Sequence, residues 1–101
     1  MTDKEVEAMI KASGAEAPRV TPEHINSIIV DAAYYVFPDT TLTICALTLK
    51  NGFVVTGESA AASPANFNEE IGKTIAYANA HQKIWALEGY LLRQKLYEGN
   101  L

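Results

Sequence analysis

The sequence is poor in the residues that build metal sites and common active sites. Its 101 residues include one cysteine and two histidines, with none of the close Cys/His spacings of structural zinc sites. Cys45 has no partner for an internal disulfide, and its surroundings indicate a buried small hydrophobic residue. Phosphate-binding loops, dinucleotide-binding glycine patterns and nucleophile elbows are also missing. We therefore expect no metal, no cofactor and no enzymatic activity.

Long apolar runs and excess positive charge are missing as well. No run of 18 apolar residues occurs, so we expect no membrane span, and the N-terminus lacks the apolar core of a secretory signal. This predicts a cytoplasmic protein. The net charge of −4 argues against binding to a nucleic acid polymer. It leaves room for a pocket that binds one small anion.

The residues that are present predict a single α+β domain over residues 1–101. A first helix is predicted at 2–14, where Thr2 and Glu5 have the spacing of a capping box. A second short helix is predicted at 20–32, with Thr21 and Pro22 at its start. Residues 32–37 can extend that helix or form a short strand.

An antiparallel hairpin or small sheet is predicted in the middle of the chain. Threonines alternate with apolar residues over 41–50, which is typical of a strand, and Asn51-Gly52 is a strong hairpin signal. The alternation changes phase at Ala46-Leu47, which indicates either a bulge or burial on both faces. The returning strand is predicted at 53–59.

A two-residue turn fixes the register of this predicted hairpin. It places Leu49 opposite Val54. Gly57, in the returning strand, indicates either a bulge or close packing against another element.

A long C-terminal helix is predicted from the cap Asn68 to about Tyr97. Its apolar residues cover most of its circumference, more than a small sheet and two short helices can bury. We therefore expect this helix to serve oligomerisation, with a second copy of the chain as the partner. The apolar stripes are Ile84, Leu87 and Leu91, and Ile71, Ile75, Ala78, Trp85, Leu92 and Leu96.

The corner before that helix is the best candidate for a binding site. Phe67 is an aromatic residue next to the helix N-terminus, where backbone amides favour an anion, and Asn66 and Asn68 flank it. Such a group suits a nucleotide, although Phe67 can equally pack on Ile71 as a hydrophobic staple. The predicted ligand-binding residues are Phe67, Asn68, Tyr77, Asn79, Arg93, Arg19 and Lys83.

Three segments together carry a resemblance to a known family. They are "LKNGFVVTGES", "NFNEEIGK" and "KIWALEGYLL", and the similarity runs from about residue 17 to residue 96. The chain resembles a family of small tailed-phage proteins named after proteins of an N-four-like and an Sf-type phage. Ala61 stands where many relatives have a cysteine. The resemblance implies a family-like core at about 17–97, with the N-terminal helix at 1–16 outside it.

That family in turn is similar to the phage anti-Thoeris sponge proteins. This similarity implies a protein of the bacterial host cytoplasm that binds glycocyclic ADP-ribose or a cyclic oligonucleotide and sequesters it without degrading it. It also implies a homo-oligomer, either a dimer or a hexamer assembled from dimers, with the purine on Phe67 or Tyr77 and the diphosphate at Arg93. Two other hypotheses are a phage accessory protein that inhibits a host protein and, ranked last, a small nucleotide hydrolase.

Overall fold

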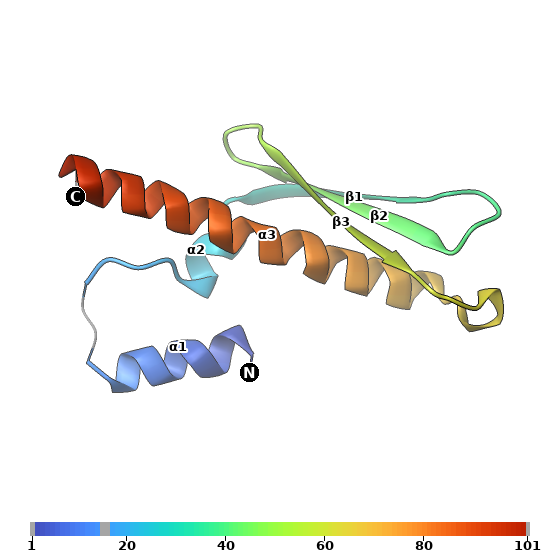
Figure 1. Ribbon diagram of the computed structural model, residues 1–101, viewed down its shortest axis with the longest axis horizontal. Helices are drawn as coiled ribbons and strands as arrows, with labels where there is room; N and C mark the ends of the chain where they lie inside the picture. Colours follow the sequence, from blue (N-terminus) through green and yellow to red (C-terminus); the bar gives the residue numbers. More distant parts are fainter. Residues whose placement is uncertain (1, 15–16, 101) are drawn as a thin grey trace.

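The computed structural model describes residues 2–14 and 17–100, and it has the α+β fold that the sequence predicts (Figure 1). Residues 15 and 16 of the predicted connector lie outside the described residues. The elements are α1 (Asp3–Ala12), α2 (Pro22–Ser27), β1 (Ile29–Val36), β2 (Leu42–Leu49), β3 (Val54–Ala60), the 3-10 turn η1 (Pro64–Asn66) and α3 (Glu69–Glu98).

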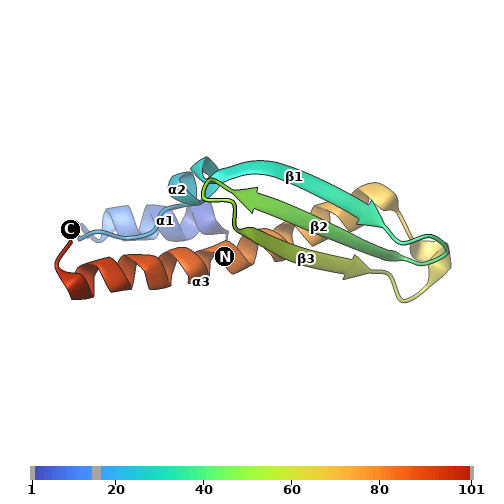
Figure 2. The same cartoon turned by 90° about the horizontal axis from the view of Figure 1, so that it is seen from above.

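The three strands form one antiparallel sheet in the order β1-β2-β3, and α3 crosses one of its faces (Figures 1 and 2). α3 packs mainly on β3 and β2, and its C-terminal half extends beyond the sheet on the side of α1 and α2. Among the described residues, no second layer covers the other face of the sheet. The buried apolar core is Ile25, Cys45, Leu47, Leu49, Val55, Ala76, Ala80 and Ile84.

The helix starts are confirmed because their caps are local. Thr2 Oγ1 accepts a hydrogen bond from the Glu5 amide at 3.1 Å, and the Glu5 carboxylate accepts one from the Thr2 amide. Thr21 Oγ1 accepts one from the His24 amide at 3.1 Å, with Pro22 in the first turn of α2. None of the helices in the described part of the chain combines the length and apolar character needed to cross a bilayer.

The predicted second helix is wrong beyond Ser27. α2 ends there, and β1 runs from Ile29 to Val36. It therefore includes all but the last residue of the segment 32–37, for which the sequence predicts either helix or strand. The β-branched run of Ile28, Ile29 and Val30 is stiff at the first side-chain torsion and fits a pleated sheet better than a helix. Pairing with β2 then decides the structure of the whole segment.

The predicted hairpin register is wrong by one residue. Val54 pairs with Thr48 rather than with Leu49, because the loop contains three residues instead of two. Gly52 adopts a φ of 90°, and the Asn51 side chain accepts a hydrogen bond from the Phe53 amide. A slip of one residue exchanges the two faces of a strand. Val54 is therefore exposed, and Val55 is buried in its place.

The predicted change of phase in β2 does not occur. Thr43, Cys45, Leu47 and Leu49 alternate regularly toward α3, and the residues between them are partly exposed on the other face. The irregularity lies instead in β1, between Ile29 and Asp31. Cys45 is fully buried, as expected, and burial raises the pKa of its thiol.

Gly57 allows β3 and α3 to come unusually close, so close packing rather than a bulge explains it. A Cβ atom added here would lie 2.8 Å from the Ala80 Cα atom, and nearer still to the Ala80 nitrogen and the Ala76 carbonyl oxygen. Small residues on both elements therefore fix the position of α3 on the sheet. This contact also fixes the corner through which β3 leads into α3.

Candidate functional site

The corner between β3 and α3 encloses a small hollow of about 110 Å³. Ser63 precedes the 3-10 turn η1, and Phe67 and Asn68 follow it directly before α3. The prolyl residue at the start of η1 and the extended backbone of Phe67 turn the chain sharply into the helix. The hollow is lined by Thr41, Ser59, Ala60, Ala61, Asn66, Phe67, Asn68, Ile71, Gly72 and Ile75.

The Phe67 ring is half-buried beside the first turns of α3. It lies near Gly72, where an added Cβ atom would be 3.7 Å from a ring carbon. Gly72 occupies the position four residues after the cap, which a hydrophobic staple would need, and it has no side chain to provide one. Ile71, the staple partner that the sequence suggested, is 59% exposed. The ring therefore packs on backbone and leaves part of its surface free.

A buried hydroxyl without a partner lies under the same helix turn. Thr43 is fully buried in β2, and its Oγ1 atom has no hydrogen-bond partner among the described residues. An added Cβ atom on Gly72 would lie 2.9 Å from this oxygen. A side chain at Gly72 would therefore collide with the sheet beneath the corner.

The N-terminus of α3 is partly satisfied by the protein itself. Asn68 Oδ1 accepts a hydrogen bond from the Ile71 amide at 3.1 Å, as the predicted cap requires. Glu69 and Glu70 follow in the first turn and complement the positive end of the helix dipole. Both carboxylates would repel an anion at this corner, so positively charged side chains from outside the corner would have to contribute to its binding.

The other predicted residues on α3 lie away from the corner. The Asn79 side chain donates a hydrogen bond of 2.8 Å to the Glu58 carbonyl oxygen at the outer edge of β3. Lys83 is exposed beside a wider hollow of about 440 Å³ between the β2–β3 hairpin and α3. Further apolar residues of that hollow are Phe53, Val54, Val55, Ala86, Leu87 and Tyr90.

Tyr77 and Arg93 also lie outside the corner. Tyr77 is half-buried, and its ring stacks on His81 with the two centroids 5.8 Å apart. His81 in turn lies 2.9 Å from the Asn26 side chain of α2. Arg93 is exposed near the C-terminal end of α3. Neither residue shares a hollow with Phe67.

Arg19 is already engaged by an acidic residue. Its guanidinium forms two hydrogen bonds to Glu7 of α1, the shorter one 2.7 Å long. The Glu7 side chain is only 8% exposed, so the pair connects α1 to the connector before α2. One chain thus brings together Phe67 and Asn68, while the five other predicted residues lie elsewhere.

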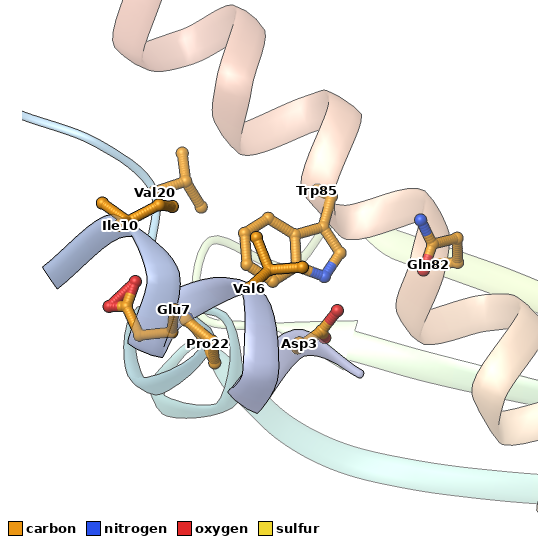
Figure 3. Close-up of a pocket in the computed structure, with 8 residues that line it drawn as sticks. All are labelled: Asp3, Val6, Glu7, Ile10, Val20, Pro22, Gln82 and Trp85. Carbon is orange, nitrogen blue, oxygen red and sulfur yellow. The ribbon is translucent and has the colours of Figure 1, made fainter. Parts of the chain in front are cut away.

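A third hollow, which the sequence did not indicate, lies between α1 and α3 (Figure 3). It measures about 190 Å³, and Val6 and Ile10 of α1 line it opposite Trp85 of α3. The Trp85 indole N–H is buried and has no acceptor among the described residues. The spacing of Val6 and Ile10 places them on one face of α1, but no local pattern indicates that Trp85 of α3 lies opposite them. Its remaining lining residues are Asp3, Glu7, Val20, Pro22 and Gln82.

The sheet, the corner and most of α3 lie within one stretch that is typical of bacteriophage proteins. Residues 20–96 match the model of the Phage protein (N4 Gp49/phage Sf6 gene 66) family. The matched stretch is most of the chain, so the protein belongs to this family. This confirms the phage-family resemblance of the sequence and leaves α1 outside the match. Comparison with curated proteins and with solved structures gave no match.

Proposed function

We propose that this phage protein binds a cyclic nucleotide immune messenger and sequesters it without degrading it. The ligand is glycocyclic ADP-ribose or a cyclic oligonucleotide of the bacterial host. The family membership and the resemblance to anti-Thoeris sponge proteins support this function. The observation that carries it in the structure is the corner, where the partly free ring of Phe67 lies between two asparagines at the start of a long helix.

Each part of the corner suits one part of a nucleotide. A purine can stack on the free face of the Phe67 ring, because bases of any sequence stack well on aromatic side chains. The amides of Asn66 and Asn68 can pair with base or ribose groups. The α3 dipole favours a phosphate, with Arg93 or Lys83 supplying positive charge to offset Glu69 and Glu70.

The hollow of one chain is too small for such a ligand. Ligand pockets usually measure about 300–1,000 Å³, while the corner offers about 110 Å³. A second copy of the chain would supply the missing walls. The described residues include fifteen exposed large apolar side chains and only eight buried apolar ones, an excess that a second copy would cover. A dimer, or a hexamer assembled from dimers, would then also allow residues such as Arg93 and Tyr77 to contribute to a corner of another copy.

A panel of cyclic nucleotides and cyclic ADP-ribose isomers tests the proposal by thermal shift. A ligand that binds only the folded state must raise the melting temperature. We expect one ligand to do so selectively, and Phe67→Ala to weaken its binding at least tenfold. Phe53→Ala is the matched control, because Phe53 is 54% exposed in the hairpin and lies outside the corner. Equal losses in both variants would remove Phe67 from the site.

The second candidate function is binding and inhibition of a host protein. The hollow beside Lys83 favours it, because Leu87 and Tyr90 are exposed there and could accept an apolar side chain of a partner. Stable capture of one host protein, together with no thermal shift by any cyclic nucleotide, would support this function instead.

A further inference from the structure

The free edge of β1 carries a row of unpaired backbone groups. The Phe37 amide donates to the Leu42 carbonyl oxygen at 3.0 Å, and antiparallel pairing then alternates along the strand. Asp31, Ala33 and Tyr35 therefore bond to β2, which is the only strand paired with β1 in the described part of the chain. The amides and carbonyl groups of Ala32, Tyr34 and Val36 point toward the open edge, which Figure 2 shows at the outer border of the sheet.

The opposite edge of the sheet, formed by β3, is protected from pairing with another strand. Asn79 donates its side-chain hydrogen bond to the Glu58 carbonyl oxygen, one of the groups that point outward from β3. Glu58 also places a charge on that edge strand, a common device against pairing with other chains. In β1, Asp31 is the only charged residue.

β1 is also the least covered strand. Six of its eight residues are exposed, while the inward-facing residues of β2 are buried. Exposed fractions reach 58% for Val30, 39% for Tyr34 and 55% for Tyr35. A long, weakly charged and apolar edge strand of this kind is suited to pairing with another strand.

We propose that β1 pairs antiparallel with β1 of a second copy, so that two sheets join into one of six strands. A two-fold axis perpendicular to the sheet then passes midway between the Ala33 residues of the two copies. In this register Ala33 faces Ala33 of the second copy, and Ala32 faces Tyr34. The register keeps the groups that point to the open edge opposite one another and uses all residues from Val30 to Val36.

The composition of β1 matches itself in this register, which is why the occupant is a second copy. On the face that carries α3, the large ring of Tyr34 meets the small side chain of Ala32. On the other face, Tyr35 meets Asp31, so the two Asp31 carboxylates are kept apart. A register centred on Ala32 would extend the pairing to Ile29, across the irregularity between Ile29 and Asp31, and one centred on Tyr34 would pair fewer residues.

Cysteine cross-linking tests the register directly. Residues opposite each other in a pair without mutual hydrogen bonds have Cα atoms about 4.5 Å apart, within the range of about 4.4–6.8 Å that a disulfide spans. We expect Ala33→Cys in the full chain to form covalent dimers on mild oxidation. Thr56→Cys is the matched control, because Thr56 is exposed on the same face of the opposite edge strand, in the same row of paired residues as Ala33, and lies outside the corner. We expect this variant to stay uncross-linked.

Proline substitution tests the same pairing without new cysteines. Ala32→Pro removes an amide that points to the open edge of β1, and Thr56→Pro removes one that points outward from β3. We expect the assembly mass, measured by light scattering, to fall for Ala32→Pro alone, with unchanged circular dichroism. A monomeric wild-type protein would overturn the proposal. So would equal cross-linking of Ala33→Cys and Thr56→Cys, or a folded Ala32→Pro variant of full mass.

Discussion

Gly57→Ala should be among the most damaging single-methyl additions in this protein. The added Cβ would lie 2.8 Å from the Ala80 Cα atom, whereas real Cβ atoms essentially never approach closer than 3.0 Å. The Ala80 nitrogen and the Ala76 carbonyl oxygen are nearer still. All of these are backbone atoms, so no side chain can rotate away. α3 must move off β3 by on the order of 1 Å, which loosens the packing of the whole core.

Overpacking of a core usually costs about 1–3 kcal/mol of unfolding free energy. Contact with backbone puts Gly57→Ala at the upper end, about 3 kcal/mol. For a domain of this size each kcal/mol lowers the melting temperature by about 4–8 °C. We therefore expect a fall of roughly 12–24 °C, measured by circular dichroism at 222 nm.

Gly89→Ala is the control for this experiment. Gly89 lies in α3 itself, but a Cβ atom added there would meet no atom within 4 Å. Because alanine favours a helix over glycine by about 1 kcal/mol, this variant should melt at a higher temperature than wild type. A Gly57→Ala protein that loses less than about 1 kcal/mol would refute the close approach of β3 and α3.

Three further predictions follow from the caps, the α1 contact and the buried thiol. Asn68→Ala removes the cap of α3 and should lower the free energy of unfolding, measured by chemical denaturation, by about 1 kcal/mol. Asn66→Ala, which removes no cap, is the control. An unchanged denaturation midpoint for Asn68→Ala would contradict the role of the cap. Arg19→Ala leaves Glu7 without its partner, so α1 should detach more often from the rest of the protein. Trypsin should then cleave after Lys11 several-fold faster, while the melting temperature of the sheet and α3 stays unchanged. An equal cleavage rate would show that the pair does not hold α1. Burial raises the pKa of the Cys45 thiol above its ordinary value of 9.0. The folded protein therefore holds this proton more tightly than the unfolded chain, and the resulting stability is present below pH 9.0 and is lost as the pH rises further. Cys45→Ala should lose less stability than wild type at high pH, and an identical dependence of stability on pH would contradict the burial effect.

The parts of the fold that the sequence predicted are those fixed by neighbouring residues. Thr2 with Glu5, Thr21 with Pro22, and Asn68 each determine a helix start through hydrogen bonds within a few positions. Distant pairing decided the parts that were missed. The run from Ile28 to Val30 becomes strand because β2 lies beside it, and the three-residue loop sets a register that the Asn-Gly signal alone does not define.

The same distinction applies to the candidate site. Phe67 and Asn68 adjoin in the chain, and their place at the start of α3 was predictable. The pairing of Arg19 with Glu7 and of Asn79 with the Glu58 carbonyl group depends on contacts between separate elements, which no local pattern reveals. The hollow between Trp85 and α1 depends on how α1 folds back toward α3, so no local pattern predicts it.

The measurement that tests the central claim most directly is recovery of a bound ligand. The protein is incubated with each cyclic nucleotide, separated from free ligand by filtration, heated, and the released compound is analysed by mass spectrometry. Sequestration predicts that one ligand is retained in a fixed ratio to protein and is released with its mass unchanged. Retention of none would contradict messenger binding, and release of a hydrolysed product would contradict binding without degradation.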